Sequence, residues 1–236
     1  MNKLREAVIR TSAAPVAAVL LAFAPASGAP ELNFGPTLKH ATSTAATPDP
    51  DGFLQRWSVL EPIRIQIRSN AELVDSFVQA NIKKDYFANQ YTVIPRDGEK
   101  VTVNGTELTW HAVDASVYYV DLFHMASALG KPTYNVVFWA VTTVNCPEEL
   151  HNARLAVGSN AASIWWVNGQ EVIGIYKDRH LMKDDGISKR LTLKKGPNIV
   201  RCAVINSPGT SQFCARFLDA DDKPIKGITL SVDTEK

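Results

Sequence analysis

The sequence has few cysteines and no excess of charge of either sign. Its 236 residues include three cysteines, 25 lysines plus arginines and 24 aspartates plus glutamates, a formal net charge of +1. This balance provides no electrostatic attraction to a nucleic-acid backbone. No Cys-x-x-Cys pair and no cluster of cysteine and histidine occurs, so the sequence indicates no zinc site. We expect neither a nucleic-acid partner nor a metal-ligand set.

The sequence motifs of common hydrolases and nucleotide-binding enzymes are also missing. There is no Gly-x-Ser-x-Gly, no His-Glu-x-x-His and no phosphate-binding P-loop. The five histidines are scattered: His40, His111, His124, His151 and His180. A Ser–His–Asp triad built from distant loops stays open, because triads have no fixed order in sequence. We assign no catalytic residue, and a small chain without a catalytic signature favours a binding module.

The single long apolar run is near the N-terminus. Ala13–Ala24 is a stretch of twelve apolar residues, preceded by Lys3, Arg5 and Arg10. A transmembrane helix needs about 20 apolar residues, so no membrane span is expected. The pattern is typical of a secretory signal peptide, with cleavage after Ala26 and a second option shortly beyond it; the alternative is a disordered tail. Residues 1–26 are therefore interpreted as a signal peptide, and the protein as secreted or periplasmic.

Residues 27–52 are rich in Pro, Thr, Ala and Ser and are interpreted as a linker or extended lead-in. The folded domain is expected over residues 53–234. Export would permit disulfides, but the cysteine count is odd. Cys202 and Cys214 lie in neighbouring strand-like runs and are candidates for pairing. The alternative, which the size of the core favours, is that these two and Cys146 are all small buried hydrophobes.

Most of the domain is expected to be β-structure. Ser69–Glu72 has a capping-box pattern, and helical spacing follows, which predicts a helix over residues 71–84. Residues 121–129 are a second, shorter helix candidate. Asn104-Gly105 and Asn168-Gly169 predict two tight hairpins, because these residues tolerate the positive φ of a type I′ turn. Many further short runs of β-branched and aromatic residues indicate an all-β sandwich or barrel.

The second hairpin has two different faces. A two-residue turn places Val167 opposite Gln170 and Trp165 opposite Val172. The face predicted to be core carries five residues: Ala162, Ile164, Trp166, Ile173 and Ile175. On the other face, Trp165 stands among small and polar neighbours. An exposed tryptophan would pack against the C–H face of a sugar ring; the alternative is that both faces are covered and Trp165 is core.

The loop after this hairpin concentrates polar side chains. With Trp165 as the apolar platform, it supplies the candidate ligand-binding set: Trp165, Tyr176, Arg179, His180, Asp184 and Asp185. Charged groups of this kind bind sugar hydroxyls, which both donate and accept hydrogen bonds. The alternative is an internal Arg179–Asp184 ion pair that closes the loop. Alternation along the strongest strands also predicts a core: Leu155, Val157, Ile164, Trp166, Ile173, Leu191, Leu193, Val200, Val204, Phe213 and Phe217.

The order of these segments resembles a known kind of module. Arg56–Ile63 (RWSVLEPI), Leu155–Asn160 (LAVGSN), Ile164–Val172 (IWWVNGQEV), Leu193–Val200 (LKKGPNIV) and Phe213–Ile225 follow one another as in galactose-binding-like jelly-roll modules of secreted bacterial carbohydrate-active proteins. The resemblance covers about residues 53–232. It departs from the motif at Glu61 and Lys223, which replace glycines. It departs also at Asn160-Ala161, which replaces an acidic pair.

This resemblance implies a jelly-roll β-sandwich with one or two short helices. It also implies a non-catalytic carbohydrate-binding module, accessory to polysaccharide degradation, with a polysaccharide or oligosaccharide as partner. Such modules stand beside acetylxylan esterases, so a partner catalytic domain or enzyme is expected too. No cofactor is expected, although a structural calcium ion is compatible with the resemblance. If the acidic pair of the resembled motif serves a calcium ion or a sugar, this chain has lost charge there, at Asn160-Ala161. The alternatives are a stand-alone acetylxylan-esterase-like hydrolase and a cell-envelope interaction protein.

Overall fold

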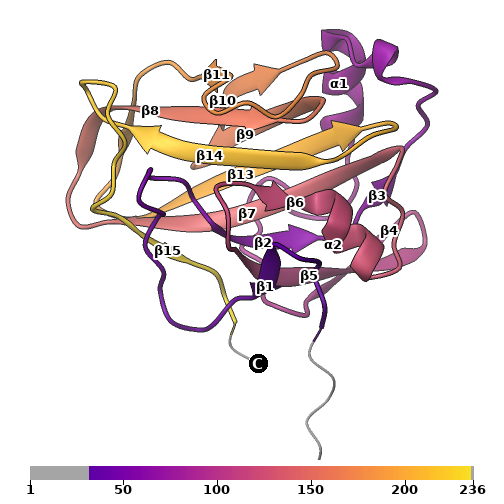
Figure 1. Cartoon of the computed structure of the whole chain (residues 1–236), viewed down its shortest axis with the longest axis horizontal. Helices are drawn as coiled ribbons and strands as arrows, with labels where there is room; N and C mark the ends of the chain where they lie inside the picture. The colour runs from indigo at the N-terminus through magenta and orange to yellow at the C-terminus, as the bar shows by residue number, and fades with distance from the viewer. Residues whose placement is uncertain (1–31, 235–236) are drawn as a thin grey trace, which may run out of the picture. The chain divides into compact units, whose positions relative to one another are not determined.

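A computed structural model describes residues 32–234, which form two antiparallel sheets packed face to face (Figure 1). The ten-stranded sheet has the path β1-β5-β2-β7-β13-β9-β10, with β3 and β15 paired to β7 and β4 paired to β5. The five-stranded sheet has the path β11-β8-β14-β6, with β12 paired to β8. The all-β sandwich expected from the sequence is confirmed.

The strands of the large sheet have these bounds: β1 Leu38–His40, β2 Arg56–Leu60, β3 Ile63–Arg64, β4 Lys100–Val103, β5 Thr106–Ala115, β7 Val136–Cys146, β9 Ala162–Val167, β10 Gln170–Ile175, β13 Gly196–Asn206 and β15 Thr229–Ser231. Those of the small sheet are β6 Val120–Asp121, β8 Leu150–Ser159, β11 Gly186–Ile187, β12 Leu191–Leu193 and β14 Gln212–Leu218. From β8 onward the chain crosses repeatedly between the sheets, as in a jelly roll.

The large sheet is buried on both faces. One cluster fills the space between the sheets and includes Trp57, Phe138, Trp165 and Phe213. A second cluster lies on the opposite face of the large sheet, where α1 (Asp75–Ile82) and the segments around it cover Trp166. Strands buried on both faces carry near-continuous apolar runs, which explains why all six residues of β9 are buried.

The helix expected over residues 71–84 is interrupted. A short 3₁₀ turn, η1 (Asn70–Glu72), precedes α1. The carbonyl of Leu73 accepts a hydrogen bond from Lys177 N at 2.8 Å, so a tertiary contact takes the group that a continuous helix would use. The Ser69 side chain makes no capping hydrogen bond. The second helix, α2 (Leu122–Ala128), forms where it was predicted, with Asp121 accepting from His124 N at its start.

Both Asn-Gly hairpins are confirmed. Asn168 and Gly169 have φ values of 52° and 81°, and Val167 pairs with Gln170. The predicted register then fails, because a bulge places Ile173 rather than Val172 opposite Trp165. A bulge inserts one residue in one strand and shifts every later pair.

Nine of the eleven predicted core residues are buried, and Ile173 and Leu191 are half-buried. Part of the expected linker belongs to the fold, since Leu38–His40 pair with β5 and Phe34 is buried. The expected signal peptide lies outside the described residues. The three cysteines are buried and free. Cys202 faces the interior between the sheets, whereas the Cys214 thiol lies near Met182 O on the other side of its strand, so the two do not face each other.

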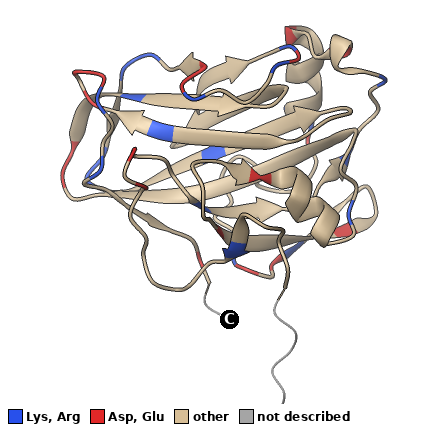
Figure 2. Ribbon diagram, in the orientation of Figure 1, with Lys and Arg blue, Asp and Glu red and all other residues tan. Residues whose placement is uncertain are grey.

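Many charged residues lie in loops and at strand ends, and a few lie within strands, among them β14 (Figure 2). Over residues 32–234, no helix has both the length and the apolar character needed to cross a membrane.

Candidate functional site

Trp165 is not a sugar platform. Its side chain is fully buried between the sheets, where it packs against Trp57 at 6.2 Å and Phe213 at 5.6 Å between ring centroids. Its indole Nε1 donates to Ser163 Oγ at 2.8 Å, so its one polar group is satisfied internally. The alternative that Trp165 is a core residue is confirmed, and its place in the candidate binding set is wrong, because the small sheet covers that face of β9.

The loop after β10 is closed by Arg179, although not through the expected partner. The Arg179 guanidinium pairs with Asp185 and donates twice to the Tyr176 carbonyl, at 3.1 and 2.7 Å. Tyr176 OH in turn contacts the side-chain amide of Gln79 on α1. The Arg179–Asp185 ion pair therefore holds the loop in its conformation. The Arg179 side chain is still 29% exposed.

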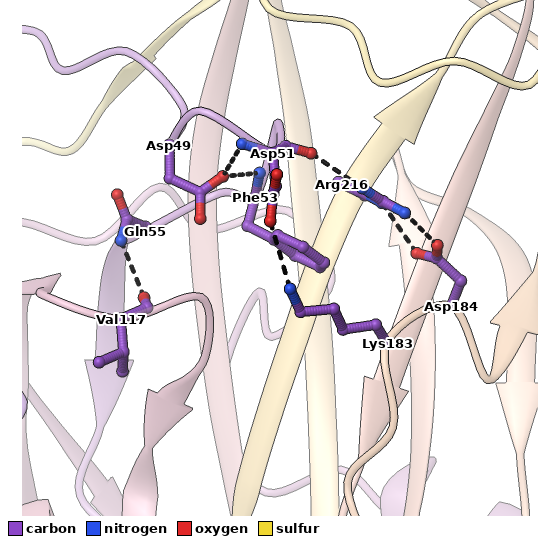
Figure 3. Close-up of polar contacts among 8 residues, drawn as sticks. All are labelled: Asp49, Asp51, Phe53, Gln55, Val117, Lys183, Asp184 and Arg216. Atoms are coloured by element: carbon purple, nitrogen blue, oxygen red, sulfur yellow. Dashed lines mark hydrogen bonds and ion pairs between the residues drawn. The ribbon is translucent and has the colours of Figure 1, made fainter.

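Asp184 lies on a separate cluster against β14. Its carboxylate pairs with Arg216, with Nε to Oδ1 at 2.9 Å, and Arg216 also donates to the Asp51 carbonyl (Figure 3). The neighbouring Lys183 ammonium lies 3.3 Å from the Asp51 carboxylate and 4.5 Å from the centre of the Tyr118 ring. The structure thus separates Asp184 from Arg179 and His180, which the sequence had grouped with it.

Gly158 allows this loop to approach the small sheet closely. A Cβ placed there would lie 1.9 Å from the Met182 carbonyl oxygen and 3.2 Å from Cys214 Sγ. Any side chain at this position of β8 would push the loop away. The glycine of the LAVGSN segment is therefore required by backbone approach rather than by its own dihedral angles.

Arg179 and His180 do line a cavity, which we call the amide pocket. It has a volume of about 280 Å³ and lies where β9 begins and β10 and β13 end. Its lining residues are Asn70, Asn160, Ala161, Asp178, Arg179, His180, Asn206, Pro208, Gly209 and Thr210. The volume is near the lower limit of ordinary small-molecule pockets.

Asparagines hold the walls of the amide pocket together. Asn70 accepts from Ser207 N at 3.1 Å and donates to Asp178 Oδ1 and Pro208 O, each at 3.0 Å. Asn206 is buried and donates to Thr210 O at 2.8 Å and Ser211 Oγ at 3.0 Å. Two separate loops are therefore fixed in position before any ligand arrives.

Asn160 differs from these two asparagines. Its side-chain oxygen is buried and accepts no hydrogen bond from any described residue. Its neighbour Ala161 has a left-handed φ of 57°, an unusual conformation for alanine that two backbone bonds hold: Ala161 N to Arg179 O and Asn160 N to Gln212 O. A buried acceptor without a partner costs roughly 1–3 kcal/mol. Such a group in a strained turn is a feature of functional sites.

Sequence reasoning missed most of this pocket. Arg179 and His180 were selected; Asn70, Asp178 and Asn206 were not, because they come from three segments that only the fold brings together. Asn160 carried one signal, as the residue that replaces an acid in the resembled motif. His180 is exposed and makes no hydrogen bond or ion pair within residues 32–234, so its imidazole is available.

Within residues 32–234, one hydroxyl, one imidazole and one carboxylate lie in a row: Thr192 Oγ1 lies 3.4 Å from His151 Nδ1, and His151 Nε2 lies 3.1 Å from Glu149. The His151 and Glu149 side chains are 67% and 52% exposed, so water has full access to them. Within the same residues no group of three His, Cys, Asp or Glu side chains is placed to hold a metal ion.

No protein-family model and no curated protein matches the sequence. Among solved structures, the PA14 sugar-binding domain of an RTX adhesin aligns with 77% of this chain and all of its own, at 13% identity and a TM-score of 0.42. The PA14 domain of the MpAFP antifreeze protein aligns with 80% of this chain and 96% of its own, at 11% identity and a TM-score of 0.42. The Candida glabrata epithelial adhesin 9 A domain, in complex with Galb1-4GlcNAc, aligns with 85% of this chain and 97% of its own. Its identity to this chain is 8% and its TM-score is 0.39. These likenesses are too distant to transfer a residue or an activity.

Proposed function

We propose that this chain is a non-catalytic carbohydrate-binding module and that the amide pocket holds its sugar. The observation that carries the proposal is a preformed polar cavity whose wall includes Asn160, a residue with a buried side-chain oxygen that has no hydrogen-bond partner among residues 32–234. When the Asn160 side chain turns toward the cavity, a ligand hydroxyl can donate to this oxygen and recover the cost of its burial.

The chemistry of the pocket suits a neutral sugar. Each sugar hydroxyl both donates and accepts, and amide side chains offer both functions. Asn160 supplies an acceptor, and the His180 imidazole and the remaining Arg179 donors supply the complementary groups. Because Asn70 and Asn206 already bond to the pocket walls, little further ordering is needed when a ligand binds.

The wider role rests on the sequence resemblance. We propose that the module is exported by its N-terminal segment and acts beside a polysaccharide-degrading enzyme. An esterase activity of the chain itself has little support, because the His151 and Glu149 side chains are mostly exposed and not held in place by packing, and the Thr192–His151 contact is long. Ester hydrolysis needs a well-aligned nucleophile and base and preorganised donors to the oxyanion.

The test is calorimetric titration of the full chain with xylan, galactan and cellulose oligosaccharides, together with an ester-hydrolysis assay. His180→Ala is the informative variant, because the His180 side chain is exposed and makes no hydrogen bond or ion pair within residues 32–234. His151→Ala, an exposed histidine outside the pocket, is the matched control. We expect one oligosaccharide to bind, with affinity lowered about tenfold or more by His180→Ala and unchanged by His151→Ala. Equal affinity of both variants, or ester hydrolysis with no sugar binding, would overturn the proposal.

A further inference from the structure

A second cavity lies at the opposite end of the β9–β10 hairpin. It has a volume of about 430 Å³ and runs between the Asn168-Gly169 end of the hairpin and residues 189–194, which include β12. We call it the basic groove. It shares no lining residue with the amide pocket.

Positive charge dominates this groove. Lys189, Arg190 and Lys194 line it, and all three are exposed. Its one acidic side chain, Glu171, is already paired with Lys83, with Nζ to Oε2 at 2.5 Å. Within residues 32–234 the ammonium groups of Lys189 and Lys194 make no hydrogen bond or ion pair. The groove thus presents cations whose counter-charge is not supplied by the described chain, which favours an anionic ligand.

The remaining surface of the groove suits a sugar ring. Val172 and Leu191 line it half-buried, so part of each apolar side chain faces the cavity. Gln170 and Thr192 are exposed beside them and bring an amide and a hydroxyl. Apolar contact suits the C–H face of a pyranose, and the polar groups can bond its hydroxyls.

The same lining argues against a nucleic acid. No aromatic side chain lines the groove, so there is no surface on which a base can stack. The net charge of +1 provides no extended field for a phosphate backbone. Lys189 and Lys194 are two local cations beside the apolar side chains of Val172 and Leu191. This arrangement suits separate carboxylates on a sugar chain better than the continuous charge of a nucleic-acid backbone.

We propose that the basic groove binds an acidic oligosaccharide, in which carboxylates carried by the sugar rings pair with Lys189 and Lys194. This site is independent of the amide pocket, so one can fail while the other stands. Arg190 is less available than the lysines, because it donates to the Asn152 carbonyl at 2.9 Å and lies 3.8 Å from Asp222.

The experiment compares two ligands with the same sugar chain, one with free carboxylates and one with neutral methyl esters. A short galacturonic acid oligosaccharide and its fully methyl-esterified form are titrated into the full chain by calorimetry. We expect the acid form to bind at least about tenfold more tightly, with affinity falling as ionic strength rises from about 0.05 M to about 0.3 M. Equal affinity for the two forms, or no binding of the acid form, would overturn the proposal.

Variants then locate the binding. Lys189→Ala/Lys194→Ala should lower affinity for the acid form by about tenfold, and Lys189→Arg/Lys194→Arg should retain most of it. Lys39→Ala is the matched control, because Lys39 is exposed on β1 at the other edge of the same sheet. Thermal unfolding checks that all variants fold. An equal loss in the control, an unaffected double variant, or tighter binding of a glutamate oligopeptide at the same lysines would contradict an acidic-sugar site.

Discussion

The indole rings of Trp139 and Trp166 stack on each other, with 5.5 Å between their centroids and 17° between their planes. Trp139 is on β7 and Trp166 is on β9, and β13 lies between these strands in the sheet. Tyr91, from the segment that covers this face, contacts both rings edge-on at 5.8 and 5.6 Å. These three rings join the large sheet to the segment around Tyr91, which packs on this face of the sheet.

Trp166→Ala should therefore be strongly destabilising. Trp166 is 4% exposed, and its removal leaves a cavity beside Trp139. We expect the free energy of unfolding to fall by about 3–5 kcal/mol, measured by urea denaturation, with Trp166→Phe losing less. A loss within about 0.5 kcal/mol, as at an exposed position, would show that this face is not packed.

Gly158→Ala tests the close approach of the loop to β8. The new Cβ would overlap the Met182 carbonyl oxygen, so we expect a loss of about 1–3 kcal/mol in the free energy of unfolding. Gly227→Ala is the matched control, because no atom lies within 4 Å of a Cβ there and its φ is not left-handed. If the two variants are equally stable, the loop does not lie on β8 as described.

His111 makes stability depend on pH. Burial lowers its pKa below the ordinary value of 6.5, against the opposing effects of Glu61 and Asp97, while Lys131 adds to the lowering. As pH falls below about 6.5, the unfolded chain takes up this proton before the folded protein does, so stability decreases. It continues to decrease until pH reaches the lowered folded pKa.

His111→Gln should remove this contribution. Between pH 7.5 and pH 5, the slope of unfolding free energy against pH should become shallower, by at most about 1.4 kcal/mol per pH unit. The comparison with the unchanged protein isolates His111, because every other ionisable group is present in both. An unchanged slope, measured by denaturation across this range, would contradict a buried, neutral His111.

Asn160→Leu separates a binding role from a structural one. Because the Asn160 oxygen has no partner, its removal should not lower the free energy of unfolding by more than about 0.5 kcal/mol, while sugar affinity is lost. Asn206→Leu, which removes satisfied bonds to Thr210 and Ser211, should cost about 1–3 kcal/mol. Urea denaturation of both variants measures these two changes in unfolding free energy. A large loss from Asn160→Leu would mean that its oxygen is bonded within the fold.

Features set by neighbouring residues were predictable from the sequence. The Asn168-Gly169 turn and the helix that begins after Asp121 follow from local preferences of a few residues. Trp165 was not predictable in this way. Its cover consists of Trp57 and Phe213, which are distant in sequence, and alternation along β9 cannot show whether a second sheet lies above it.

The bulge at Val172 and the amide pocket could not be predicted from local sequence either. The bulge shifts the register without a marked change in side-chain type, so counting from the turn gave wrong partners beyond Glu171. The pocket needs Asn70, Asn160 and Asn206 from three separate segments of the chain, and no spacing along the sequence connects them. Two signals for the pocket were present in the sequence: Asn160-Ala161 replaces an acidic pair of the resembled motif, and Arg179 and His180 are polar residues in one loop.

The most direct test of the amide pocket is an NMR titration that follows the side-chain amides of Asn70, Asn160 and Asn206 and the imidazole of His180. Xylan, galactan and cellulose oligosaccharides are added in turn to the isotope-labelled chain. The account predicts that one of them shifts these four groups together along a single saturation curve, with the Asn160 amide among the most affected. Saturable shifts confined to residues outside the pocket, or no shift with any oligosaccharide, would contradict it.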